Sequence, residues 1–144
     1  MVMGPRAGTV FEVMAGLARW GLGGTAGNGR QYVAWIHEED FVRAVEFLIA
    51  REDLEGAINV CSPNPLPNRH FNKILRQAVG APFGLPVFEW MLEVGAVLMR
   101  TETELILKSR RVVPKRLLDA GFQFTHPEWP AAAHAIAGSR RLSP

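Results

Sequence analysis

The chain has 144 residues, a formal net charge of +2, one cysteine and 48% hydrophobic residues, which suits a single ordinary globular unit. The near-neutral charge argues against a nucleic-acid-binding protein, the lone Cys61 excludes an intrachain disulfide, and the apolar segment at residues 87–99 is too short and too interrupted by acidic residues to cross a membrane. Because the N-terminus lacks a cationic and apolar leader, we expect a soluble cytoplasmic protein.

Residues 9–79 predict three helices and two strands in alternation. A helix is expected over residues 9–20, where apolar residues recur at helical spacing behind a Thr-x-x-Glu capping box. The β-branched and aromatic residues at 30–36 predict a strand, and residues 37–51 predict the next helix. A short apolar run at 57–61 is typical of a buried strand, and a helix is expected over 69–79.

Two of these helices carry local signals that make specific predictions. Apolar side chains at helical spacing in residues 37–51 predict a stripe that faces the core, formed by Phe41, Val45, Leu48 and Ile49. The Pro- and Asn-rich segment at 62–68 predicts a loop, in which Asn68 is expected to cap the following helix and Gly80 to end it.

The second half of the chain predicts mainly helices. A strongly apolar helix is expected over residues 86–100 with a helical continuation over 101–108, and an extended stretch at 110–113 precedes a short helix from Pro114 to Gly121. A capping box formed by Thr125 and Glu128 predicts a last helix that ends near residue 137.

The glycine-rich segment GLGGTAGNG at residues 21–29 matches the G-x-x-G-x-x-G spacing of some pyrophosphate-binding loops. Such a loop must follow a strand and open a helix, so that the helix N-terminus faces the phosphates. Here the predicted order is helix, loop, strand, so we interpret the segment as a tight reversal that needs positive φ angles.

Three segments in this order carry a family resemblance. These are WIHEEDFVRAVEFLI (35–49), EGAINVCSPNPLPNRHFNKIL (55–75) and RRVVPKRLLDAGFQFTHP (110–127). Together they resemble the C-terminal half of extended short-chain dehydrogenase/reductases, the NAD(P)-dependent epimerase/dehydratase enzymes. The segments GLGG…GNGRQYVAWIHEED (21–40), NVCSPNPLPNRHF (59–71) and RRVVPKRLLDAGFQFTHP (110–127) narrow the resemblance to the sugar-nucleotide epimerase branch that carries a small helical C-terminal extension, and the likeness runs from Gly4 to about Ile136.

The resemblance implies a helix-rich α/β fold, the C-terminal substrate-side portion of a Rossmann-type enzyme, with short strands and about six helices. Residues 1–80 would be its substrate-side α/β part and residues 81–144 its helical extension. Family members place the cofactor loop and a proton-transferring Tyr-x-x-x-Lys pair in a preceding nucleotide-binding domain. The one tyrosine here, Tyr32, has Ile36 four residues later. The resemblance therefore implies NAD or NADP for the full-length protein, no cofactor bound by this chain alone and no catalysis by it alone.

Five residues are candidates for contact with a sugar-like substrate: Arg30, His37, Asn64, Asn68 and Arg69. In the family an arginine four residues before the His of I-H-x-x-D often binds the substrate diphosphate, but a valine stands there in this chain. Arg30 could still reach an anion from its loop. The Asn64–Arg69 loop follows a strand expected at the ligand-binding edge of the parent sheet.

Some candidate residues also have a purely structural interpretation. His37 and Asp40 match I-H-x-x-D, and they either contact substrate or form a strand-to-helix junction in which an acidic side chain accepts first-turn amides. No metal site is predicted, and the other histidines, His70, His126 and His134, are expected on the surface. Cys61 is expected to be buried and inert.

The remaining signals concern partners. Five cations in residues 108–116 indicate a solvated face or, alternatively, an anion or partner site. The apolar helix at 87–99 and the unpaired edges of strand 57–61 predict a homodimer, and in a full-length protein the N-terminal nucleotide-binding domain would cover part of the same surface. The competing hypothesis is a stand-alone small-anion or protein-binding module without enzymatic activity.

Overall fold

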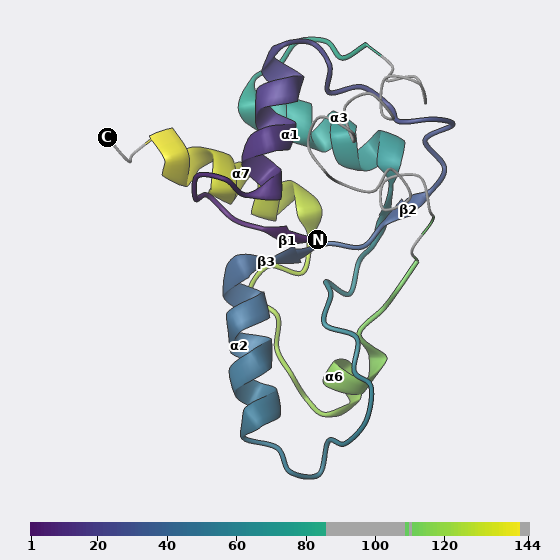
Figure 1. Ribbon diagram of the computed structural model, residues 1–144, viewed down its shortest axis with the longest axis vertical. Coiled ribbons are helices and arrows are strands. Elements are labelled where there is room, and N and C mark those ends of the chain that lie inside the picture. Colours follow the sequence, from purple (N-terminus) through teal and green to yellow (C-terminus); the bar gives the residue numbers. More distant parts are fainter. Residues whose placement is uncertain (86–108, 110, 142–144) are drawn as a thin grey trace.

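The computed structural model describes residues 1–85, 109 and 111–141. Within these residues the chain forms five helices and four two-residue strands, which confirms the expected helix-rich α/β class. The helices are α1 (Val10–Arg19), α2 (Glu38–Ile49), α3 (Asn68–Val79), α6 (Lys115–Asp119) and α7 (Trp129–Arg141). The strands are β1 (Val2–Met3), β2 (Tyr32–Val33), β3 (Ile36–His37) and β4 (Leu66–Pro67). In Figure 1, α1, α3 and α7 lie at one end of the molecule and α2 and α6 at the other, with β1 and β3 between them.

The four strands form two separate pairs. β1 runs parallel to β3, with Val2 opposite Ile36, and β2 runs antiparallel to β4, with Val33 opposite Leu66. The single strand predicted over residues 30–36 is therefore two strands, because its two halves bind different partners on either side of Trp35.

The strand predicted over residues 57–61 is wrong. These residues form no strand, and the chain next to them is tied to Trp35 by one backbone hydrogen bond, from Ser62 N to Trp35 O at 2.6 Å, whereas a ladder needs a series of such bonds. A strand forms instead at β4, inside the segment expected to be a loop. Pro67 is tolerated in this strand because β4 pairs along only one edge among the described residues.

Trp129 lies at the centre of the main core, between α1, α3 and the strands. Its ring stacks on Phe71 with centroids 4.0 Å apart and lies 4.9 Å from the Trp35 ring, and its indole N–H donates to the Phe71 carbonyl oxygen at 3.0 Å. The indole is thus both buried and satisfied. This core joins the first helix of the chain to the last, because Phe11 of α1 also lies against Trp129.

A smaller core lies between α2, α6 and the segment after α6. Ala44, Leu117 and Phe122 are its buried members, with Phe47 edge-on to Phe122. The side of α2 that was expected to face the core is therefore wrong. Asp40 and Ala44 face inward, whereas three members of the predicted core stripe, Phe41, Val45 and Ile49, are exposed.

The glycine-rich segment is a structural loop that binds to α3. Gly21, Gly27 and Gly29 have positive φ angles, as its interpretation as a tight reversal requires. Asn68, Asn72 and Arg76 lie one turn apart on one face of α3. Their side chains bind the loop backbone: Asn68 accepts from Ala26 N at 2.9 Å, Asn72 donates to Gly24 O at 2.7 Å and Arg76 donates to Gly23 O at 2.6 Å.

Several predicted helix ends need correction, while others hold. Asn68 does not cap α3, because its side chain is used by the loop and the N-cap position is Pro67. Thr125 and Glu128 do not form a capping box either, because α7 begins at Trp129, beyond both residues, and extends to residue 141. Thr9 does cap α1, accepting from Glu12 N, and Gly80 ends α3 in the left-handed conformation.

The helices predicted over residues 86–100 and 101–108 lie outside the described residues. The short helix predicted from Pro114 to Gly121 is confirmed as α6. No described helix combines the length and the apolar character that crossing a bilayer would require.

Candidate functional site

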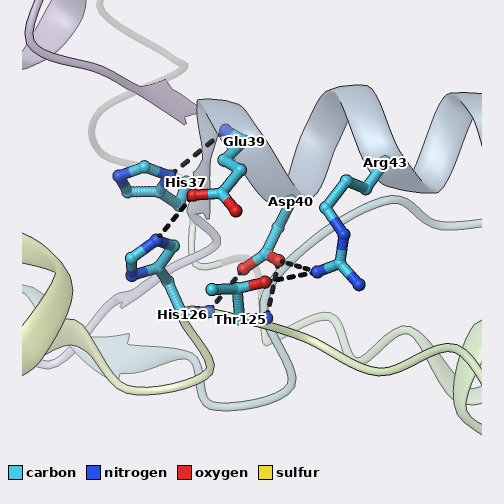
Figure 2. A network of polar contacts seen from close by, with 6 residues as sticks. All are labelled: His37, Glu39, Asp40, Arg43, Thr125 and His126. Atoms are coloured by element: carbon cyan, nitrogen blue, oxygen red, sulfur yellow. Dashed lines mark hydrogen bonds and ion pairs between the residues drawn. The ribbon is translucent and has the colours of Figure 1, made fainter.

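A network of polar side chains lies where α2 meets the segment that leads into α7. Figure 2 shows its six residues: His37, Glu39, Asp40, Arg43, Thr125 and His126. Three come from α2, His37 ends β3 directly before it, and two come from the segment just before α7, so the network joins parts of the chain more than eighty residues apart.

His37 is the N-cap of α2. Its Nδ1 accepts from Glu39 N at 3.2 Å, so Nδ1 is unprotonated and the neutral ring carries its proton on Nε2. Burial and the neighbouring His126 imidazole lower the pKa of His37, in spite of the acidic side chains nearby. The residue is thus a neutral donor at Nε2 near pH 7.

His126 stacks on His37, with ring centroids 3.8 Å apart and planes inclined by 29°. Its Nε2 lies 3.1 Å from Glu39 Oε2, and since a carboxylate only accepts, this nitrogen carries the proton. His126 is partly buried rather than freely exposed, because stacking and the Glu39 contact leave its side chain 20% exposed.

Asp40 holds the two sides of the network together. Its carboxylate is fully buried and accepts from Thr125 N at 2.7 Å, from His126 N at 2.8 Å and from Arg43 Nη1 at 3.2 Å. Arg43 also donates to Thr125 Oγ1. An acidic side chain was expected to accept amides of its own first turn, but Asp40 accepts amides of a distant segment instead.

His37, Glu39 and His126 are also the group of described residues whose ligand atoms all lie within 4.8 Å of one another. Two imidazoles and a carboxylate are a suitable donor set for zinc or a similar ion. The arrangement does not converge on one point, however, because the rings are stacked and the Nδ1 lone pair of His37 already accepts an amide. We interpret the group as a hydrogen-bonded stack.

The five predicted contact residues fall into two groups by their neighbours. His37 lies in the network, and Asn64 binds the adjacent segment through its side-chain amide, which donates to Pro127 O at 3.3 Å and to Glu128 Oε1 at 2.6 Å. The other three lie together beside the glycine-rich loop. Asn68 N donates to Gln31 O and Arg69 N to Gly29 O, and the side chains of Arg30 and Arg69 are exposed.

Sequence patterns did not indicate the members of the network other than His37 and Asp40. Glu39 and His126 are separated by 87 positions, and no local spacing relates them. His70 and His134 are exposed, as expected, and Cys61 is buried, with burial raising the pKa of its thiol.

The basic segment at residues 108–116, which ends in the first turn of α6, is partly occupied by contacts within the chain. Arg111 lies over the Tyr32 ring at 5.1 Å, Lys115 pairs with Asp119, and Arg116 donates to Ala57 O at 3.0 Å. These contacts favour a structural role for the described part of this segment over a free cationic surface.

Comparison with known proteins shows what this chain is similar to. A family model described as Domain of unknown function (DUF1731) matches residues 87–136. Epimerase family protein MT2273 of Mycobacterium tuberculosis is 38% identical over 126 residues, which cover 88% of this chain and 41% of that protein. Epimerase family protein YfhF of Bacillus subtilis is 33% identical over 119 residues, 83% of this chain and 38% of that protein.

A solved structure agrees over nearly the whole chain. The crystal structure of human epimerase family protein SDR39U1 (isoform 2) with NADPH has a TM-score of 0.84 at 30% identity, and the match covers 95% of this chain and 45% of the human one. The chain thus spans less than half the length of each of these three proteins. The chain corresponds to the C-terminal part of epimerase family proteins, the part that carries the DUF1731 domain, and its fold matches that of an epimerase family protein solved with NADPH.

Proposed function

We propose that this region forms the substrate-side wall of an NAD(P)-dependent epimerase-like oxidoreductase and supplies neither the cofactor loop nor the proton-transfer pair. The observation that carries the proposal is the agreement with a family member whose structure was determined with NADPH, over 95% of this chain but only 45% of that protein. The nucleotide-binding domain that accompanies this region in its relatives would hold the cofactor.

Two features of this chain support the proposal that it supplies neither the cofactor loop nor the proton-transfer pair. In the glycine-rich loop the Ala26 amide already donates to Asn68 of α3, and the Gly24 and Gly23 carbonyls accept from Asn72 and Arg76 and cannot donate to a phosphate. A pyrophosphate would therefore have to displace Asn68 from the Ala26 amide. The only tyrosine, Tyr32, has Ile36 where the Tyr-x-x-x-Lys pair requires lysine. An acid/base of matched pKa is therefore missing from that motif.

The side chains left for a ligand suit a polar, anionic small molecule such as a substituted sugar. Arg30 and Arg69 are exposed and lie close in space, because Arg69 N donates to the carbonyl oxygen of Gly29, and neither forms an ion pair with another described residue. Their guanidinium groups would bind an anionic substituent, and Nε2–H of His37 would donate to a substrate oxygen. Asn64 would hold the segment at Pro127 and Glu128 in place, and Asn68 would hold the glycine-rich loop, through the hydrogen bonds described above.

The test joins the nucleotide-binding half of the Mycobacterium tuberculosis relative in frame ahead of Met1 and titrates NADPH and NADH by fluorescence. The chimaera is expected to bind a nicotinamide cofactor saturably, and the chain alone is expected to bind neither. Saturable cofactor binding by the chain alone would refute the proposal. A chimaera that folds without binding either cofactor would favour the competing view of a stand-alone binding module.

We also infer that the chain alone forms a homodimer through the apolar residues 87–99, since burying a large apolar side chain contributes about 1.5–3 kcal/mol. Light scattering at tens of micromolar is expected to give twice the monomer mass of 15.9 kDa. A clean monomer under the same conditions would contradict this inference.

A further inference from the structure

The two stacked imidazoles of the polar network each have one ring nitrogen that the network does not use. Nδ1 of His37 accepts from Glu39 N, and Nε2 of His126 donates to the Glu39 carboxylate, so Nε2 of His37 and Nδ1 of His126 are left over. Neither of these nitrogens has a hydrogen-bond partner among the residues that the structure describes. In Figure 2 both lie on the same side of the stack, away from α2. His37 is only 9% exposed, so its free ring nitrogen is a buried polar group that needs a partner.

The two free nitrogens are of opposite kinds. Because Nδ1 of His37 accepts an amide, Nε2 of the neutral ring carries the proton and is a donor. Because Nε2 of His126 carries the proton that it donates to Glu39, Nδ1 of the neutral ring is an acceptor. The ring centroids are 3.8 Å apart, so the donor and the acceptor lie side by side.

This pairing selects the chemistry of a ligand. A hydroxyl group accepts from one nitrogen and donates its own hydrogen to the other. A carboxylate or sulfate oxygen only accepts, and an ammonium group only donates, so each would leave one of the two nitrogens unpaired. The neutral stack therefore favours a hydroxyl group over a charged group.

The position and rigidity of the stack suit a binding site. His37 ends β3, which runs parallel to β1, and ligands of open α/β folds bind beyond the carboxyl ends of such strands. His126 is held at its backbone by Asp40, which accepts from His126 N at 2.8 Å, and at its ring by Glu39 and the stack. Both rings are thus fixed before a ligand arrives, which lowers the entropic cost of binding.

We propose that His37 and His126 form a binding site for a hydroxyl group of the sugar-like substrate, with Nε2–H of His37 as the donor and Nδ1 of His126 as the acceptor. This rests on the proposed function. It adds His126 to the contact residues and gives it a specific role, the selection of a neutral, hydroxylated part of the substrate.

The first test determines which ring nitrogens carry protons. A long-range ¹H–¹⁵N NMR spectrum of the chain with ¹⁵N-labelled histidine is recorded at pH 8, above the range in which an ordinary imidazole titrates. Both His37 and His126 are expected to be neutral and protonated on Nε2. A proton on Nδ1 of either ring would overturn the proposal, because the adjacent donor and acceptor would not exist.

The second test titrates methyl α-D-glucopyranoside, which carries only hydroxyl and ether oxygens, into the chain alone and into the chimaera described above. Saturable shifts are expected at Nε2 of His37 and Nδ1 of His126. The exposed His70 and His134 are internal controls and should not respond. Sulfate, which only accepts hydrogen bonds, should leave the pair unchanged. Equal shifts at all four histidines, saturable shifts of the pair with sulfate, or no glucoside shifts of the pair in either protein would each refute the site.

Two substitutions separate the acceptor from the ring. His126→Phe keeps an aromatic ring against His37 but removes the acceptor, and it should weaken glucoside binding about fivefold or more. His126→Asn offers an amide oxygen close to the position of Nδ1 and should bind within about twofold of the unaltered chain. His134→Phe is the matched control and should have no effect. Unaltered binding by His126→Phe would show that Nδ1 is not a contact.

Cofactor binding by the chimaera distinguishes this site from the proposed function. A chimaera that binds NADPH but shows no glucoside shifts would refute the hydroxyl site alone. Glucoside shifts in a chimaera that binds neither nicotinamide cofactor would support the hydroxyl site and count against the proposed function.

Discussion

Replacing Asp40 is expected to break the connection between α2 and the segment before α7. In Asp40→Ala the amides of Thr125 and His126 lose their acceptor, and the Arg43 guanidinium loses its partner. A hydrogen bond to a charged group contributes about 1.5–3 kcal/mol. Water can replace the acceptor at the exposed Thr125, and the pair with the 40% exposed Arg43 side chain is screened. The free energy of unfolding should therefore fall by about 2–4 kcal/mol.

Urea denaturation followed by circular dichroism measures this loss, with Asp53→Asn as control. Asp53 also pairs with an arginine, Arg51, through two contacts of 2.7 Å, but it is exposed and accepts no distant amide. The control should leave the urea midpoint unchanged. In Asp40→Asn one oxygen remains, so the loss should be smaller than in Asp40→Ala. If Asp40→Ala is no less stable than Asp53→Asn, the buried carboxylate does not stabilise the fold as described.

Three further predictions concern the core and the loop. Trp129→Phe keeps the stacking on Phe71 but removes the indole donor and part of the ring, and thermal unfolding should show a loss of about 1–3 kcal/mol; an unchanged midpoint would contradict the central place given to this ring. Asn68→Ala removes the buried acceptor of Ala26 N and should cost about 1–3 kcal/mol, with faster hydrogen exchange at Ala26 as the specific readout; unchanged exchange there would count against the loop's attachment to α3. Cys61 should react with a disulfide reagent at neutral pH only after denaturant is added, because burial raises its thiol pKa and blocks access; rapid reaction of the folded chain would show that the thiol is accessible.

The elements predicted well are those determined by neighbouring residues. The cap at Thr9, the left-handed stop at Gly80 and the short helix before Gly121 depend on signals within a few positions. The order of helix, loop and strand around the glycine-rich segment also follows from signals within neighbouring residues. This order by itself argues against a phosphate cradle, and the hydrogen bonds from the loop to α3 agree with that interpretation.

The errors arose where distant contacts decide the structure. The Asp40 carboxylate accepts hydrogen bonds from amides 85 and 86 positions away, and no spacing in the sequence relates the two segments. The stripe on α2 is apolar as predicted, but it does not face the core of this chain, because Asp40 and Ala44 lie on the buried side of the helix instead. The strand expected over residues 57–61 fails because strand formation depends on a pairing partner as well as on composition.

The candidate site was only partly accessible to sequence reasoning. The I-H-x-x-D pattern indicated His37 and Asp40, but the roles of both depend on the segment at 125–126. Arg30 and Arg69 come together because Arg69 N donates to Gly29 O, a contact across forty positions that no motif encodes. Their contribution to substrate binding stays a prediction.

The account depends most on the claim that the glycine-rich loop is occupied by α3 and holds no cofactor. The direct measurement is an amide NMR titration of the isotope-labelled chain alone with NADPH. The account predicts that the amides of residues 21–29, Ala26 among them, keep their positions up to millimolar cofactor. Saturable shifts at Gly24 and Ala26 would contradict it, because the loop would then bind the pyrophosphate that its glycine spacing resembles.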